Sequence, residues 1–186
     1  MPKKGWKKQK RYLRISGLRQ RGIINTIMPV FVLLVLIVTL FSAGVASYYY
    51  SGMQRGLEIR VQDAADSFNS YFMNSYTEYY QMAVYYTDSF DDKDRIELQF
   101  ISPSGRIQAS SYGLTVGTSP RTTDITDAVS TGEKAVFQGK DPATGESILS
   151  VAYPLMLNER VVGVMRLVTA LRTVDRQVML AVLAVF

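Results

Sequence analysis

One uncharged run constrains the fold of this chain more than any other feature. From Gly22 to Gln54 no residue carries a charge, and the part from Ile27 to Ala46 is predominantly apolar. A helix rises about 1.5 Å per residue, so about 20 such residues cover the roughly 30 Å hydrocarbon core of a bilayer. Pro29 lies in the first turn of this part, where its missing N–H costs little. We therefore predict a transmembrane helix over residues 22–47.

The charges that flank this run predict its orientation. Nine of the 21 lysine and arginine residues lie within residues 1–21, which contain no acidic residue, whereas the rest of the chain holds 12 basic and 16 acidic residues. Because basic segments beside a span stay on the cytoplasmic side, residues 1–21 are predicted to be a cytoplasmic tail and the following domain to lie outside. A basic tail can also bind nucleic acid, but its position beside a span favours the membrane, and we expect no nucleic-acid partner.

A cleaved signal peptide is the alternative interpretation of the same run. Gly44-Val45-Ala46 offers small residues at a plausible cleavage site. Signal peptides have an apolar region of only about 7–15 residues, however, and this one is much longer. The length favours a permanent membrane anchor.

The last residues of the sequence are apolar as well. Val178 to Phe186 contains no charge and has no polar tail. Nine residues are too few to span a bilayer, and as the end of a soluble helix they would expose apolar surface on all sides. We expect residues 173–186 to be the start of a second transmembrane helix in the front portion of a longer membrane protein.

The composition excludes several classes of chemistry. The chain has no cysteine and no histidine, which removes disulfides, cysteine-based zinc sites, the usual serine-hydrolase triad and a phosphoacceptor histidine within this segment. No glycine-rich phosphate loop is present. Asp91-Asp92-Lys93-Asp94 lacks the glycine and the distal glutamate of an EF-hand loop. The sequence therefore predicts no catalytic residue, no metal ligand and no cofactor in this segment.

A helical pattern follows the predicted span. Apolar and aromatic residues recur at steps of three and four from Leu57 to Tyr86, with polar residues between them. We predict one long amphipathic helix within residues 48–90, ending near Ser89. The apolar stripe is expected to pack against a sheet, to pair with a second copy, or both.

The next part alternates as strands do. Ile96, Leu98 and Phe100 are separated by polar residues, and Ser102 to Gly105 fits a type I turn that leads into a second strand. Downstream, the sequence predicts a short helix capped by Asp124 and stopped by Gly132, and then strands at 135–138, 148–156 and 161–171. We therefore predict an α+β domain whose five-stranded antiparallel sheet lies within residues 91–172.

This order of elements carries a family resemblance. Together with "FISPSGRIQASS", "GKDPATGESILSVAYPL" and "ERVVGVMRLVTAL", it resembles the extracytoplasmic PAS-like (single Cache) sensor domain of bacterial two-component sensor histidine kinases, over roughly residues 57–172. The resemblance implies a bacterial cell (plasma) membrane protein that forms a homodimer. It also implies a cytoplasmic kinase beyond this sequence, which would use ATP and Mg²⁺ and pass phosphate to a response regulator.

The expected function is that of a signal-sensing input region for such a kinase. The stimulus would be a small molecule or a protein outside the membrane. An alternative in the same architecture is the input region of a chemoreceptor or of a cyclic-dinucleotide enzyme. A membrane-anchored, non-signalling α+β domain is a third interpretation, and the second apolar run argues against it because an anchor needs only one span.

The resemblance implies a ligand pocket between the sheet and the segment from the second strand through the short helix. Arg166 is the first candidate, because it shares a strand face with Val162, Val164 and Val168, and a charge there needs a partner or solvent. It would bind a carboxylate or phosphate ligand. Alternatively, this face is partly solvated, or Arg166 pairs with an acid on a neighbouring strand. Both of these situations are commoner than ligand binding, because exposed strand faces often carry charge.

Further ligand-binding candidates are Ser110, Tyr112, Arg121 and Tyr153. Ser110 and Tyr112 would offer hydroxyl groups at the end of the second strand. Arg121 would line the pocket from its loop or would be an ordinary exposed arginine. Tyr153 would present its hydroxyl to a ligand or would fill the core.

Overall fold

The computed structural model describes residues 16–72, 75–113 and 115–172. The elements, in chain order, are α1 (Ser16–Phe72), α2 (Tyr76–Asp88), β1 (Ile96–Ile101), β2 (Ile107–Ser110), α3 (Thr123–Thr131), β3 (Ala135–Lys140), β4 (Ser147–Leu157) and β5 (Arg160–Ala170). The prediction of an α+β fold is confirmed. Most of the predicted basic tail and the predicted start of a second transmembrane helix lie outside the described residues.

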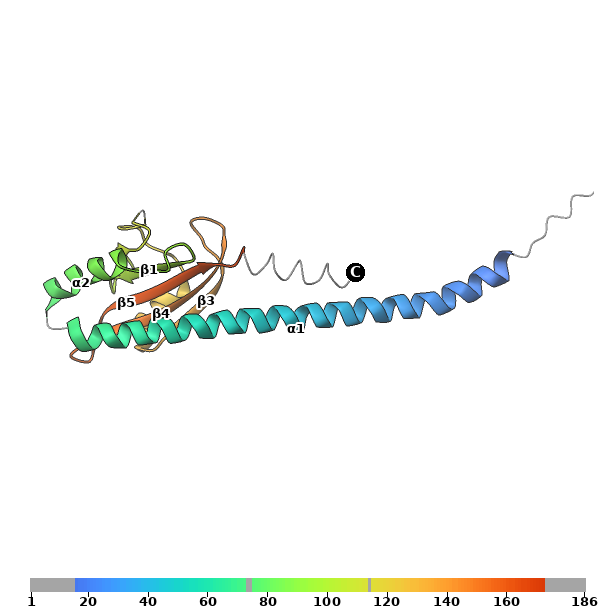
Figure 1. Cartoon of the computed structure of the whole chain (residues 1–186), viewed down its shortest axis with the longest axis horizontal. Helices are drawn as coiled ribbons and strands as arrows, with labels where there is room; N and C mark the ends of the chain where they lie inside the picture. Colours follow the sequence, from blue (N-terminus) through green and yellow to red (C-terminus); the bar gives the residue numbers. More distant parts are fainter. Residues whose placement is uncertain (1–15, 73–74, 114, 173–186) are drawn as a thin grey trace, which may run out of the picture.

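Helix α1 is one unbroken helix of 57 residues. Its segment Ile27–Ser70 contains an 18-residue window with a mean hydropathy of 2.6, none of it buried, which makes α1 long and apolar enough to cross a membrane. Further along, Leu57, Val61 and Phe68 are buried against the sheet. Figure 1 shows the sheet at one end of α1, with the rest of the helix extending far beyond it. A single helix therefore joins the apolar segment to the core of the domain.

The prediction of one helix ending near Ser89 is wrong, because two helices occupy this region. Helix α1 ends at Phe72, and α2 runs back over the sheet (Figure 1). Ser75 has an extended backbone, with φ −148° and ψ 158°, and its hydroxyl accepts a hydrogen bond of 3.2 Å from the Glu78 N–H. Such an N-cap starts a new helix. The reversal lets apolar residues of both helices face the same sheet, whereas one straight helix would extend beyond the sheet's edge.

The sheet has the strand order β2-β1-β5-β4-β3, and all neighbouring strands are antiparallel. Two hairpins show why the chain turns where it does. Gly105 closes the β1–β2 turn with φ +82° and donates a 2.8 Å hydrogen bond to the Ser102 carbonyl. Asn158 and Glu159, with φ +48° and +63°, form the two-residue turn between β4 and β5. The predicted five-stranded antiparallel sheet is confirmed.

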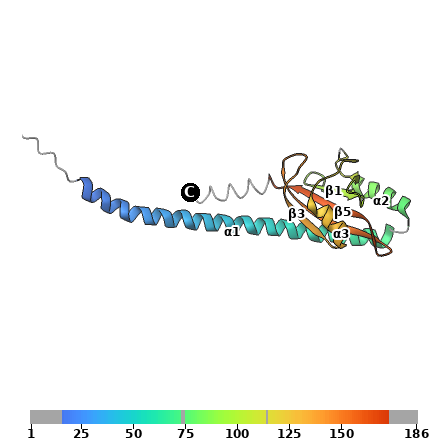
Figure 2. The same ribbon diagram turned by 180° about the vertical axis from the view of Figure 1, so that it is seen from behind.

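The two faces of the sheet are covered by different helices. Helices α1 and α2 cover one face, and α3 covers the other, as the opposite views of Figures 1 and 2 show. On the α1–α2 face, the Phe68 ring lies 5.0 Å from the Phe100 ring and 5.7 Å from the Tyr79 ring, measured between centroids. On the α3 face, Ile125 and Ala128 of α3 pack with Ile101, Ile107, Ala152 and Val164 of the sheet. Each face thus contributes its own apolar cluster.

The start of α3 differs from the prediction, whereas its end agrees with it. The N-cap is Thr122, with φ −103° and ψ 148°, and Asp124 lies inside the first turn instead of capping it. Asp124 is fully buried because its carboxylate points to the sheet. Gly132 ends the helix with φ +69°, a left-handed conformation that glycine adopts without strain.

Candidate functional site

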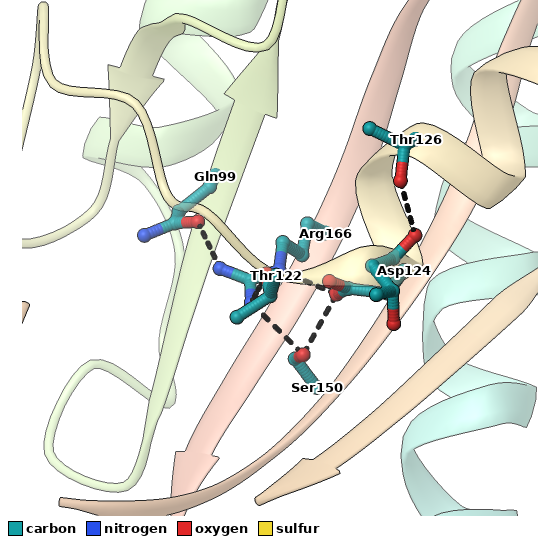
Figure 3. A network of polar contacts seen from close by, with 7 residues as sticks. Gln99, Thr122, Asp124, Thr126, Ser150 and Arg166 are labelled. Atoms are coloured by element: carbon teal, nitrogen blue, oxygen red, sulfur yellow. Dashed lines mark hydrogen bonds and ion pairs between the residues drawn. The ribbon is translucent and has the colours of Figure 1, made fainter. Parts of the chain in front are cut away.

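The centre of the α3 face holds a buried arginine. Arg166 belongs to β5, its side chain is 2% exposed, and its register partners are Gln99 of β1 and Ala152 of β4. The guanidinium Nε donates a 2.7 Å hydrogen bond to Oδ2 of Asp124, and Nη1 donates one of 3.0 Å to Oε1 of Gln99. A buried charge is tolerated only with such partners. Figure 3 shows these side chains converging beneath α3.

Two hydroxyl groups complete this network. Nη2 of Arg166 donates to Oγ1 of Thr122 at 2.8 Å and to Oγ of Ser150 at 2.9 Å. The Ser150 hydroxyl in turn donates to Oδ2 of Asp124 at 2.7 Å. Residues from β1, β4, β5 and α3 therefore hold one ion pair together, and we call this set the Arg166 network (Gln99, Thr122, Asp124, Ser150 and Arg166).

Asp124 has one carboxylate oxygen without a partner. Oδ1 is buried, and no hydrogen-bond donor from residues 16–72, 75–113 or 115–172 reaches it. The carboxylate lies in the first turn of α3, where the helix dipole favours negative charge. An unpaired buried acceptor still carries a desolvation cost of about 1–3 kcal/mol. The Arg166 network can therefore accept one further donor.

The structure resolves the alternatives that the sequence left open for the environment of Arg166. Its partner is an acid, but the acid lies on α3 and not on a neighbouring strand. Between the sheet and α3, the side chains of Arg166, Asp124 and Ser150 are buried in contact with one another. Arg166 thus holds α3 on the sheet.

Ser110 and Tyr112 lie away from the Arg166 network, at the end of the edge strand β2. The Ser110 hydroxyl donates a 2.6 Å hydrogen bond to Oε1 of Glu97, which also accepts one of 2.6 Å from Thr115. Tyr112 is 47% exposed. Partial burial, followed by the neighbouring Glu97 carboxylate, raises the pKa of the Tyr112 phenol. These residues form a separate polar cluster around Glu97.

Arg121 and Tyr153 line two further hollows. Arg121 is exposed and lines a hollow of about 370 Å³ between the β1–β2 turn and the start of α3. Tyr153 lies on the α1–α2 face, where its hydroxyl donates a 3.2 Å hydrogen bond to Oδ1 of Asp66. It lines a hollow of about 500 Å³ beside α1. Burial and the Asp66 carboxylate raise the pKa of Tyr153.

The five candidate residues therefore do not converge on one site. Arg166 is in the buried network, Ser110 and Tyr112 are near Glu97, and Arg121 and Tyr153 line separate hollows. Sequence reasoning missed Gln99, Thr122, Asp124 and Ser150. A charged residue inside an apolar strand signals a buried acid, but nothing local selects one of the chain's 16 acidic residues. Within the described ranges, no group of three or more potential ligand residues is placed to hold a metal ion.

Comparison with known proteins identifies solved structures of similar fold. No protein-family model and no curated protein matches the chain. Among solved structures, it is similar to an extracellular ligand-binding receptor from Desulfohalobium retbaense, with a TM-score of 0.51 and 12% identity over 69% of this chain and 24% of that one. This likeness shows the fold. The α+β fold with its five-stranded antiparallel sheet agrees with the fold class predicted from the sequence.

Two sensor domains of histidine kinases are also among the similar structures. The DctB sensor domain of V. cholerae matches with a TM-score of 0.45 and 13% identity, over 72% of this chain and 59% of that one. The DcuS sensor domain of E. coli matches with a TM-score of 0.46 and 15% identity, over 67% of this chain and 96% of that one. The chain thus spans about three fifths of the first domain and nearly all of the second.

Proposed function

We propose that this chain is the signal-sensing, membrane-anchored input region of a two-component sensor histidine kinase. The sensor domain lies outside a bacterial cell membrane and passes a stimulus to a cytoplasmic kinase beyond this sequence. That kinase uses ATP and Mg²⁺ and phosphorylates a response regulator. The observation that carries the proposal is the continuity of α1, which extends from a candidate membrane span into the core of a sensor fold.

The packing of the two ends of the domain supports a role in transmitting a signal from the domain to the membrane. Leu57, near the point where α1 meets the sheet, and Leu171, just after β5, belong to the same buried cluster. The Leu171 N–H also donates a 2.8 Å hydrogen bond to the Ser147 carbonyl. The chain therefore enters and leaves the domain through one packed core. A stimulus that binds two arrangements of this core with affinities differing by about 1–3 kcal/mol would shift their populations.

The basic tail and the free face of α1 support the proposed topology and assembly. Nine basic residues before the span favour a cytoplasmic N-terminus. Leu57, Val61 and Phe68 are used in packing against the sheet, but Ile59 on another face of α1 is 61% exposed. We place the contact between two copies of a homodimer along this face.

The Arg166 network supports a location for the stimulus. In it, a carboxylate, an amide and two hydroxyls converge on one buried guanidinium group. A small molecule with a carboxylate or phosphate group offers the same acceptor chemistry as Asp124. In this proposal the ligand enters when α3 lifts, and it replaces the Asp124 carboxylate on Arg166.

Labelling of a single cysteine tests the location of the domain. The chain has no cysteine, and Ser104 lies exposed in the β1–β2 turn. A Ser104→Cys variant should react with a membrane-impermeant maleimide in intact cells. A cysteine in the basic tail, at Lys8, is the matched control and should react only after lysis. The reverse pattern would contradict the proposed orientation.

Phosphate transfer tests the proposed output. The complete protein, purified in membranes, should take up the γ-phosphate of ATP in an acid-labile form typical of phosphohistidine. Arg166→Ala should change the initial rate of uptake, because it removes the cation that holds α3 on the sheet. Lys140→Ala, which removes an exposed cation of the same domain, should leave the rate unchanged. A protein that takes up no phosphate would instead fit a chemoreceptor.

A further inference from the structure

The two ends of α3 are attached to two different elements. At its start, the Asp124 carboxylate and the Thr122 hydroxyl bind Arg166 of β5. Just beyond its end, Nζ of Lys134 lies 2.8 Å from Oε2 of Glu58 on α1. Helices α3 and α1 cover opposite faces of the sheet (Figures 1 and 2). The Lys134–Glu58 contact therefore passes around the edge of the sheet, where β3 is the last strand.

Glu58 is well suited to hold this contact. Its side chain is only 18% exposed, and its second oxygen, Oε1, accepts a 2.8 Å hydrogen bond from Nε2 of Gln54, one turn earlier on α1. The hydrogen bond from Lys134, followed by that from Gln54, lowers the pKa of the Glu58 carboxyl. Both oxygens are engaged, and the partly sheltered pair is screened less than a fully exposed one.

The segment between the two attachments is short and well fixed. Helix α3 has nine residues, and Ile125 and Ala128 are buried in the cluster on its face of the sheet. The Gly132 N–H donates a 3.1 Å hydrogen bond to the Ala128 carbonyl, which fixes the turn after the helix. Only Gly132 and Glu133 separate the helix from Lys134. Because the helix and the turn after it are fixed in this way, a displacement of the start of α3 also displaces Lys134.

We propose that α3 and the turn after it form a strap between β5 and α1, in which the Lys134–Glu58 pair transmits changes in the Arg166 network to the helix that enters the membrane. Lys134 and Glu58 are positioning residues in this arrangement and need not touch a ligand. The signalling consequence rests on the proposed function, whereas the mechanical coupling is a property of the described domain. A second route, through the sheet alone, would not depend on Lys134.

Hydrogen exchange in a double-variant cycle tests the strap. Thr122→Val removes one acceptor of Arg166 with little change in shape, and should loosen the start of α3. In the otherwise unchanged chain, solubilised in detergent, it should speed amide exchange over residues 54–62 of α1 about threefold. In a Lys134→Gln background, Thr122→Val should no longer change exchange over residues 54–62, although it still speeds exchange in α3.

Two further variants sharpen the result. Lys140→Gln removes an exposed lysine of β3 and should leave the effect of Thr122→Val on α1 intact. The charge exchange Lys134→Glu with Glu58→Lys should restore that effect. Two results would overturn the strap. One is that Thr122→Val speeds exchange over residues 54–62 equally in the Lys134→Gln background, and the other is that it has no effect there in the parent chain. The measurement needs no ligand and no kinase, so its failure is distinct from a failure of the labelling and phosphorylation tests.

Discussion

The two faces of the sheet are stabilised in different ways. Beneath α1 and α2, the largest buried side chains are apolar or aromatic, as with Phe68, Phe100 and Met165. Beneath α3, an apolar cluster surrounds the buried Arg166–Asp124 ion pair. Apolar packing tolerates many arrangements of similar volume, whereas a buried charge needs particular partners at particular distances. The first face therefore gives the domain its stability, and the second makes the seating of α3 depend on a few polar contacts.

A charge placed in the apolar face should have the largest effect. Phe100 is fully buried, and its ring contacts the rings of both Phe68 and Tyr79. Phe100→Asp buries an unpaired carboxylate and should cost more than about 4 kcal/mol, enough to unfold the domain. Phe100→Leu, which keeps an apolar side chain, should cost much less. Near-ultraviolet circular dichroism during urea unfolding of the solubilised chain measures both, and equal stability of the two variants would place Phe100 outside the core.

A smaller but still large loss is expected on the polar face. Asp124→Ala leaves Arg166 buried without its carboxylate, which should cost about 3–5 kcal/mol. The double variant Asp124→Leu with Arg166→Met removes both charges and should regain most of that stability. The same urea unfolding experiment compares them. If the double variant were as unstable as Asp124→Ala, packing and not charge would explain the role of this face.

The smallest of these effects concerns Gly163, where the apolar face leaves no room for a side chain. A Cβ added at Gly163 of β5 would lie 2.5 Å from the Tyr79 hydroxyl oxygen and 3.0 Å from the Ile101 carbonyl oxygen. Gly163→Ala should therefore cost about 1–3 kcal/mol, because Tyr79 must move and its hydrogen bond to Gln108 is strained. In a Tyr79→Phe background the cost should fall, since the nearest atom is absent. An unchanged cost there would assign the strain to the backbone of β1.

Much of this fold could be predicted from local sequence patterns. The alternation around Leu98 and the turn at Ser102 to Gly105 identified the first hairpin, and the apolar runs at 148–156 and 161–171 identified the last one. These features depend on neighbouring residues, so local patterns are sufficient. The break between α1 and α2 was missed although Ser75-Tyr76-Thr77-Glu78 fits the capping-box pattern. The regular apolar spacing concealed it, because both helices use that spacing against the same sheet.

The candidate site was less predictable. Asp124 was assigned to a helix cap, a local role that its position near the start of α3 suggests. Its actual partner, Arg166, lies 42 residues away on another element, and the hydroxyl of Ser150 comes from a third. Long-range pairing of this kind depends on how α3 is seated on the sheet. Arg166 itself was identified because a charge in an apolar strand is informative without its partner.

The unbroken helix α1 also sets a direction. A helix turns by about 100° per residue, so the rotational position of the sheet about the helix axis is fixed by the number of residues between Ala46 and Leu57. One residue added there would rotate the sheet by roughly a quarter turn about the helix axis, whereas about seven residues, or two turns, would return it almost to its original position. The length of this short stretch therefore sets the rotational position of the domain about α1, and in the proposed homodimer it would decide which side of the domain faces the other copy.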